Sequence, residues 1–226
     1  MNDDDAAVAA SSAPDAEIAR LQRRVERERA ARKQAERIIE DKSRQLWEAN
    51  KKLDEAVRRL DELATHDPLT GLCNRRGLED WLRMWRGRIE RTGTRVAVVS
   101  LDLDHFKAVN DSLGHAGGDE LLQVVAQRLT QCARPTDVVV RLGGDELLVV
   151  LDAVHDIDDA VAVAERMHHV LTEGVTIGGV DIHPESSMGV ALLLDGEDPA
   201  KAITRADKAL YRAKQDGRGR IVADRS

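Results

Sequence analysis

The sequence predicts an α/β (α+β) fold, a mixed β-sheet with packed helices of the split βαβ type, preceded by one long helix. Three observations lead to this fold class. Apolar runs that are typical of buried strands alternate with stretches of helical periodicity. Two of the apolar runs flank a Gly-Gly pair closely enough to form a β-hairpin. Upstream of these runs, residues 15–63 contain no glycine or proline and are rich in Ala, Glu, Arg, Lys and Leu.

Composition limits the class of protein. The 226 residues suffice for one domain of ordinary size and an extension. A formal net charge of −7 argues against a nucleic-acid binder, which would show a basic surface. No apolar run approaches the roughly 20 residues that a membrane span needs, and the N-terminus does not resemble a signal peptide. The two cysteines, Cys73 and Cys132, lack metal-ligand spacing, so we expect reduced thiols in a cytoplasmic protein.

The N-terminal part is expected to contain a disordered tail and a coiled coil. Residues 1–14 are polar and of low complexity, as in disordered tails. Over residues 15–64, with Ile18 at position a, the a and d positions of a seven-residue repeat are mostly apolar across about seven heptads. This pattern predicts a dimerisation helix, and a parallel homodimer is the simplest assembly, although strand number and direction stay open. Three polar residues interrupt the seam: Glu28, Arg32 and Lys42.

Two features of this helix leave alternatives open. The polar seam residues are either tolerated defects or a device that sets register or regulation. Trp47 falls at the outward position b, where it either lies across the stems of Arg44 and Lys51 or contacts a partner protein.

The globular domain is expected over residues 65–226. Pro68 and Gly71 end the long helix. Because the join contains no flexible spacer, we expect rotation of the coiled coil to be transmitted to the domain. The expected elements that follow are a helix around 78–85, a strand over 95–103, a helix over 119–132, hairpin strands within 138–151, a helix over 158–171, a strand within 180–194, a helix over 199–214 and a strand at 221–222.

The hairpin and the first strand both carry carboxylates at their ends. Residues 138–151 read VVVRLGGDELLVVL, with Asp145 and Glu146 directly after the Gly-Gly pair. Because Gly144 has no side chain, a large ligand could lie against the backbone there. The first strand ends in Asp102-Leu103-Asp104, and carboxylates at the end of an apolar strand are well placed for a cleft. Alone, the hairpin tip would be an ordinary polar turn.

Four motifs together resemble those of GGDEF domains, in family order and spacing from about residue 66 to 221. They are DPLTGLCNRR (67–76), DLDHFK (102–107) with the dipeptides at 110–111, 114–115 and 118–119, RLGGDEL (141–147), and ADKALYRAK (206–214) with Gly217-Arg218. The family comprises diguanylate cyclases, which join two GTP molecules into cyclic di-GMP. The resemblance implies a fold like that of nucleotide cyclases and of the polymerase palm.

The resemblance also implies the roles of individual residues. Phosphoryl transfer needs divalent cations, Mg²⁺ or Mn²⁺, and the implied metal ligands are Asp102, the Leu103 carbonyl, Asp145 and Glu146. Asp145 and Glu146 are also the implied catalytic residues. The substrate-binding residues are then Gly143 and Gly144 at the hairpin, Asn110 and Asp119 as guanine readers, and Lys107, Lys214 and Arg218 as phosphate anchors. Without the resemblance, the basic side chains of Lys214 and Arg218 would be interpreted as ordinary solvated residues at a helix end.

A second site is implied upstream of the hairpin. Arg134-Pro135-Thr136-Asp137 resembles the inhibitory RxxD site of the family, where the product cyclic di-GMP binds. Arg166 is a further candidate for this site. Two positions depart from the family pattern: Leu147 replaces the usual Phe, and Gly219 replaces the usual Asn. Neither is a ligand or base-reading position, so we expect an active enzyme.

The expected partners are GTP, cyclic di-GMP and a second copy through the coiled coil, and a regulatory protein on the helix is a further candidate. Two other functions stay open: a non-catalytic receptor for GTP or cyclic di-GMP, and a structural adaptor whose function lies in the helix. The intact carboxylates Asp102, Asp145 and Glu146 argue against the receptor, and the retained base-reading and phosphate-binding residues argue against the adaptor.

Overall fold

The computed structural model describes the backbone of residues 4–92 and 94–225, and the side chains over 17–83 and 94–225. The chain divides into two compact units, residues 1–59 and residues 60–226. The helices are α1 (Asp4–Thr65), α2 (Arg75–Thr92), α3 (Phe106–Cys132), α4 (Ile157–Leu171) and α5 (Pro199–Gln215). The strands are β1 (Arg95–Asp104), β2 (Val138–Gly143), β3 (Glu146–Val154), β4 (Val175–Ile177), β5 (Val180–Ile182), β6 (Glu185–Leu192) and β7 (Ile221–Asp224).

Helix α1 exposes the apolar stripe that the heptad pattern predicts. The side chains of Leu46, Leu53 and Leu60, all at a positions, are 61–66% exposed in the single chain. Apolar residues repeated along one face are stabilised when a partner helix covers them. The helix begins at Asp4, so it includes residues of the 1–14 segment for which we expected no regular structure. Outside the stripe, the Lys51 ammonium lies 5.7 Å from the Trp47 ring centre, one of the two arrangements expected for this tryptophan.

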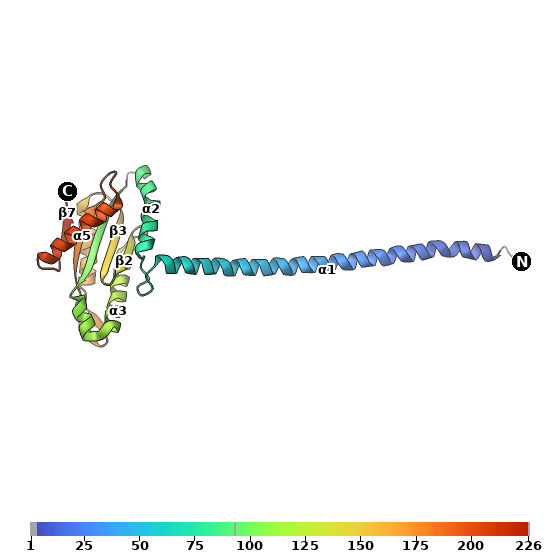
Figure 1. Ribbon diagram of the computed structural model, residues 1–226, viewed down its shortest axis with the longest axis horizontal. Coiled ribbons are helices and arrows are strands. Elements are labelled where there is room, and N and C mark those ends of the chain that lie inside the picture. Colours follow the sequence, from blue (N-terminus) through green and yellow to red (C-terminus); the bar gives the residue numbers. More distant parts are fainter. Residues whose placement is uncertain (1–3, 93, 226) are drawn as a thin grey trace. The chain divides into compact units, whose positions relative to one another are not determined.

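The sheet of the second unit is mixed, as predicted. Its strand order is β2-β3-β1-β6-β7, and only the β6–β7 pair is parallel (Figure 1). Helices α3 and α4 contribute to the larger hydrophobic core, on the face of Val99, Leu101 and Leu103. Helices α2 and α5 pack on the opposite face, against Val96 and Val98. Because both faces are covered, the central strands are continuous apolar runs.

The main differences from the predicted elements are local. Helix α3 begins at Phe106 and kinks at Gly114, where φ is 73°, so it is longer than the expected 119–132 helix. The small β4–β5 hairpin was not predicted, since its three-residue strands are too short to show a periodicity. At the tip of the β2–β3 hairpin, Gly143 pairs with Glu146, which leaves Gly144 and Asp145 as a two-residue turn. Glu146 is therefore a strand residue, and Asp145 is a turn residue.

The junction between α1 and the domain is short and is held by several hydrogen bonds. The Asn74 side-chain amide donates to the carbonyls of Ala64 and His66, at 3.0 and 3.2 Å. Its backbone N–H donates to the Thr65 carbonyl at 2.8 Å. A Cβ at Gly77 would lie 2.4 Å from that same carbonyl oxygen, so only glycine fits there. These contacts agree with the prediction of a join without a flexible spacer.

Two further expectations concern cysteines and membranes. Both Cys73 and Cys132 are free thiols. Among the helices that the structure describes, none combines the length and the apolar character that crossing a bilayer requires.

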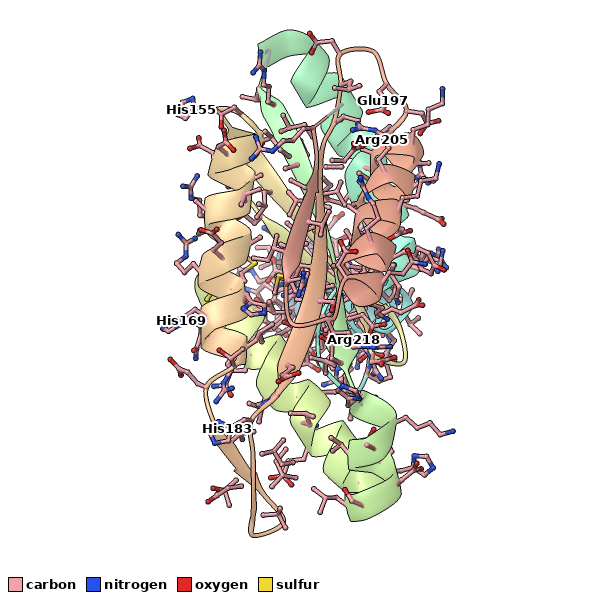
Figure 2. All side chains as sticks on the ribbon, turned by 90° about the vertical axis from the view of Figure 1, so that its left-hand side faces the viewer. His155, His169, His183, Glu197, Arg205 and Arg218 are labelled. Carbon is pink, nitrogen blue, oxygen red and sulfur yellow. The ribbon has the colours of Figure 1, made fainter. Side chains whose placement is uncertain are left out.

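Arg205 of α5 is the centre of a mostly buried ion network on the α2/α5 side of the sheet. Figure 2 shows its side chain beside that of Glu197, from which it is separated by 2.5 Å. It also contacts Asp224 at 3.2 Å and donates to the Leu192 carbonyl. Burial favours the neutral form of Glu197, but the hydrogen bonds from Arg205 and from the Leu194 N–H outweigh it and lower the pKa of Glu197 below 4.5.

We expect Arg205→Met to lower the free energy of unfolding at pH 7 by about 2 kcal/mol, because it leaves Glu197 without its charged donor. A carboxyl whose pKa is lowered by folding adds stability at neutral pH that is lost as the pH falls below its unfolded value. The variant should therefore lose less stability than the parent between about pH 6 and pH 3. Urea unfolding at several pH values measures both effects.

Arg212→Met, at an exposed position of the same helix, is the matched control. Equal stability of Arg205→Met and Arg212→Met at pH 7 would show that the network contributes little.

Candidate functional site

Carboxylates from β1 and the hairpin lie near one another where β1 ends. The β1–β3 register places Asp102 opposite Glu146. Strand alternation puts Asp102 on the same face as Val96 and Val98, which is the α2/α5 side. Asp145, in the adjoining turn, lies close enough for its charge to act on Asp102. The structure thus brings together the carboxylates that the sequence assigned to one site.

Asp102 is held in a partly buried position next to a cation. Its side chain is 13% exposed, and the Lys214 Nζ lies 2.6 Å from its Oδ2. Burial raises the pKa of Asp102, the hydrogen bond from Lys214 opposes this, and the negative charges of Asp145 and Asp104 raise the pKa further. A carboxylate whose pKa is raised by neighbouring negative charges favours a bound cation, because the cation relieves the repulsion.

The hairpin turn leaves room for a ligand. Gly143 and Gly144 have φ values of +151° and +56°, and a Cβ built on either would meet no atom within 4 Å. Arg141 fixes the turn from behind: its Nε donates to the Gly144 carbonyl at 3.0 Å, and its Nη1 donates to Asp67 at 2.9 Å. Burial favours the neutral form of Asp67, but hydrogen bonds from Thr70 and Arg141 outweigh it and lower the pKa of this carboxyl.

The two arms of the kinked α3 carry Asn110 and Asp119. Asn110 precedes the kink at Gly114, and Asp119 follows it. A Cβ at Gly118 would lie only 2.0 Å from the Asn110 Oδ1, so the absence of a side chain at Gly118 lets the two arms approach. The expected guanine readers therefore lie close together, and Lys107 is exposed in the first turn of the same helix.

The basic residues at the end of α5 face the aspartates of β1. Lys214 contacts Asp102, as described, and the Arg218 Nε lies 3.8 Å from the Asp104 Oδ1. Gly219 has φ +56°, a value that glycine adopts without strain, so its replacement of Asn suits the turn. Leu147, the other departure, is 2% exposed and lies in the hydrophobic core.

The donor set suits a hard divalent cation that also binds substrate. Within the part of the chain whose side chains are described, no three His, Cys, Asp or Glu residues gather closely enough to hold a metal alone. Asp102, Asp145 and the Leu103 carbonyl supply oxygen atoms only, which Mg²⁺ and Mn²⁺ prefer. A magnesium ion commonly completes its coordination with substrate phosphates and water, so this partial set fits such an ion.

The three residues of the expected product site line one cavity. Arg134, Asp137 and Arg166 border a cavity of about 350 Å³, with Asp152 and His155 nearby. The Asp137 carboxylate accepts hydrogen bonds from the backbone N–H groups of Arg134 and Asp152, at 2.8 and 3.0 Å. Asp137 therefore shapes the loop itself, whereas the Arg134 side chain is exposed to ligands.

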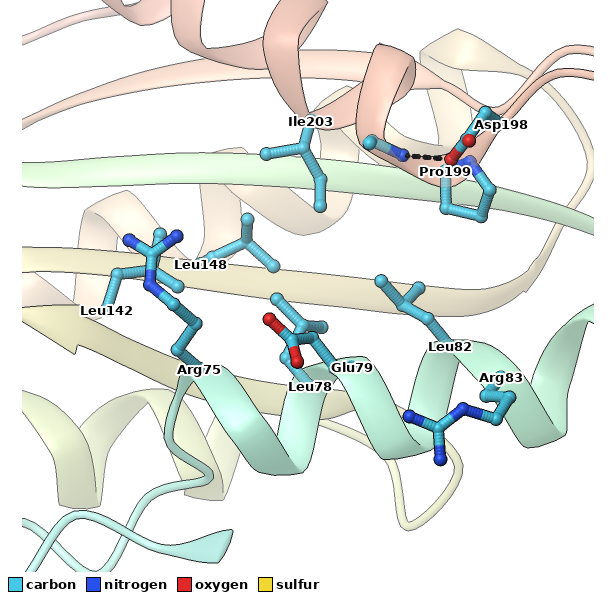
Figure 3. A pocket seen from close by; sticks show the side chains of 11 residues that line it. Arg75, Leu78, Glu79, Leu82, Arg83, Leu142, Leu148, Asp198, Pro199 and Ile203 are labelled. Atoms are coloured by element: carbon cyan, nitrogen blue, oxygen red, sulfur yellow. Dashed lines mark hydrogen bonds between the residues drawn. The ribbon is translucent and has the colours of Figure 1, made fainter.

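A further groove, of about 470 Å³, lies between α2 and α5 (Figure 3). Its floor is apolar, and its rim carries Arg75 and Glu79 from α2 and Asp198 at the start of α5. Leu148, two residues after Glu146, borders it, so the groove is on the carboxylate side of the sheet. No sequence signal pointed to it.

Three positions near the site were not assigned from the sequence. Arg141 and Asp67 belong to motifs that were recognised, but nothing in the spacing showed that they pair. Asp104 was noted as a strand-end carboxylate without a role.

Comparison with known proteins identifies the family. A model of the diguanylate cyclase GGDEF domain matches residues 64–220. The chain belongs to the GGDEF domain family of diguanylate cyclases. It is 38% identical over 168 residues to the probable diguanylate cyclase DgcE of Escherichia coli, covering 74% of this chain and 15% of DgcE. The chain spans about a quarter of the length of several curated relatives it matches.

Solved GGDEF structures extend the similarity to the helix. The coiled coil and GGDEF domain of DgcB from Caulobacter crescentus, in complex with c-di-GMP, is 27% identical, with a TM-score of 0.76 and coverage of 82% of this chain and 99% of that one. The diguanylate cyclase SiaD from Pseudomonas aeruginosa, solved with its activator SiaC, is 32% identical, with a TM-score of 0.69 and coverage of 96% and 83%. The predicted fold class is confirmed.

Proposed function

We propose that the chain is a diguanylate cyclase that condenses two GTP molecules into cyclic di-GMP and releases two pyrophosphates. The observation that carries this proposal is the proximity of Asp145 to Asp102, which lies opposite Glu146 in the strand register and contacts Lys214, within a GGDEF domain. Joining two nucleotides requires a 3′-hydroxyl aligned with an α-phosphate, together with charge neutralisation at both oxygens.

A metal site at these carboxylates would serve that chemistry. Asp102, Asp145 and the Leu103 carbonyl would hold Mg²⁺ or Mn²⁺, with Glu146 beside them. When bound, the metal offsets the negative charge on the transferring phosphate and on the attacking hydroxyl. Asp145, in the open turn, is placed to accept the proton of the 3′-hydroxyl, and Gly143 and Gly144 leave space for the triphosphate.

The surrounding residues would supply specificity and binding energy. Guanine presents donors at N1 and N2, which suit the Asp119 carboxylate and the Asn110 amide, whereas adenine presents a different pattern. Lys214 and Arg218 can donate to the phosphates, and Lys107 adds positive charge from the start of α3. Arginine forks bind phosphate oxygens in pairs, while lysine acts as a point charge.

Catalysis in this proposal requires two chains. Each domain binds one GTP, so two domains must face each other, and the exposed stripe on α1 is suited to hold two copies together. A regulatory protein could act on the same helix. The complex of the related SiaD with its activator SiaC supports this possibility.

The direct test is incubation of the full chain with GTP and MgCl₂, followed by chromatography for cyclic di-GMP and a pyrophosphate assay. We expect both products, in a ratio of one cyclic di-GMP to two pyrophosphates. Binding of GTP without turnover would favour a receptor, and absence of binding would favour an adaptor. ATP, offered at the same concentration, is expected to give no cyclic dinucleotide.

We propose further that the product inhibits the enzyme through Arg134, Asp137 and Arg166. The variant Arg134→Ala removes a bidentate donor from the cavity without removing the hydrogen bonds that Asp137 makes to the loop backbone. We expect the half-inhibitory concentration of cyclic di-GMP to rise at least about tenfold, because charge-assisted hydrogen bonds to phosphate are strong. Initial rates with added product measure this.

Arg212→Ala, an exposed arginine on α5, is the control for the loss of a positive charge. Unchanged inhibition of Arg134→Ala would place the product elsewhere. The initial rate without added product should be the same for both variants and the parent.

A further inference from the structure

Asp104 is a buried carboxylate with both oxygens within hydrogen-bond distance of protein donors. It ends β1, and its side chain is only 1% exposed. The Ser187 hydroxyl, from the neighbouring β6, donates to it, lying 2.8 and 3.0 Å from the two carboxylate oxygens. The backbone N–H of Gly219 donates to Oδ2 at 3.0 Å. The carboxylate therefore joins β1 and β6 to the turn between α5 and β7.

That turn has an unusual backbone conformation. Gly217, Arg218 and Gly219 all have positive φ values, of 112°, 62° and 56°. A positive φ is unfavourable for arginine because of its Cβ, so the surroundings must hold the turn in place. One anchor is the hydrogen bond from the Arg218 N–H to the Ala213 carbonyl at the end of α5, at 3.0 Å. The other anchor is Asp104.

The turn presents the Arg218 guanidinium to solvent. Its side chain is 50% exposed, although its Nε lies 3.8 Å from Asp104. Figure 2 shows Arg218 at the end of the domain that also carries the start of α3. Asp104 thus neutralises part of the Arg218 charge near Nε, while the exposed part of the guanidinium stays accessible to an anion.

We infer that Asp104 is a positioning residue: it anchors the Gly217–Gly219 turn so that Arg218 reaches the triphosphate, and it does not bind metal. This inference rests on the proposed function. A metal ligand must be accessible to the ion, whereas Asp104 is 1% exposed and its oxygens are engaged by Ser187 and Gly219. Asp102, which is more exposed and lies beside Asp145, is the aspartate of this strand suited to a metal.

The variant Asp104→Asn tests this, because it keeps the shape of the side chain and removes its charge. An amide would present N–H groups to donors, which loosens the turn. We expect the KM for GTP to rise about tenfold, as for the loss of a hydrogen bond to a charged group. The Mg²⁺ concentration for half-maximal rate, measured at saturating GTP, should stay the same.

A double-mutant comparison shows whether the effect passes through Arg218. If it does, Asp104→Asn combined with Arg218→Ala should have a KM within about twofold of that of Arg218→Ala alone. Multiplied effects would overturn the inference, as would a shifted Mg²⁺ dependence or an unchanged KM in Asp104→Asn.

Two serines supply a second, milder test in case Asp104→Asn does not fold. Ser187→Ala removes the donor to Asp104, whereas Ser186→Ala removes a buried hydroxyl for which the described residues offer no partner. The KM should rise in the first variant alone, and equal values would refute the inference. If the parent binds GTP but makes no product, only the proposed function fails, and the dissociation constant of a fluorescent GTP analogue replaces KM.

Discussion

Replacing Asp145 with alanine is expected to lower cyclic di-GMP formation by about three orders of magnitude, the scale seen when a group that stabilises transition-state charge is removed. The thermal midpoint should stay the same or rise slightly. In the native structure the Asp145 charge raises the pKa of the partly buried Asp102, so its removal relieves repulsion. A mutation that only disturbs folding would lower the activity and the midpoint together. Product chromatography and thermal unfolding monitored by circular dichroism measure the two quantities.

Asp195→Ala, at an exposed loop position, is the control for this experiment. It should leave both the rate and the midpoint unchanged. If Asp145→Ala retained more than about a tenth of the parent rate, the metal site and the catalytic role of the hairpin turn would both have to be abandoned.

The second large effect is expected from the a positions of α1. The double variant Leu46→Lys/Leu53→Lys places charges in the apolar seam, which two paired helices do not tolerate. At submicromolar protein, we expect the rate per chain to fall by about two orders of magnitude, because tethering raises the effective concentration of the second domain by at least that factor. The loss should diminish as protein concentration rises.

A matched variant separates pairing from charge. Glu48→Lys/Glu55→Lys also adds lysines to this part of the helix, but at the outward c positions. It should keep its activity and its mass as a dimer in analytical ultracentrifugation. If Leu46→Lys/Leu53→Lys were as active as this control at every concentration, α1 would have no part in assembling the catalytic pair.

The sequence predicted most of the fold because the domain is built from strongly patterned elements. The apolar run of β1 and the hairpin at Gly143-Gly144 were recognisable locally, and the family motifs placed Asp102 and Asp145 together. The contacts that hold the site were not recognisable, since they join distant positions. Arg141 and Asp67 are 74 residues apart, and Asp104 and Gly219 are 115 apart. No local periodicity encodes such pairs.

The kink in α3 shows a second limit. A glycine inside a helical pattern can be tolerated within the helix or can end it. Only the packing of Asn110 against Gly118 shows that the two arms of α3 come together. Asp102 and Asp104 show the same limit. Both stand at the end of β1, but Asp104 is more deeply buried than Asp102, and the sequence does not show this difference.

The hydrogen bonds of Asn74 have a consequence for engineering. They tie the start of the domain to backbone carbonyls at positions 64–66. Backbone carbonyls are present whatever the sequence of the helix before them. Many upstream helices could therefore be spliced on without redesigning the domain. The splice should be made in steps of seven residues, because each residue added or removed turns the attached helix by about 100°.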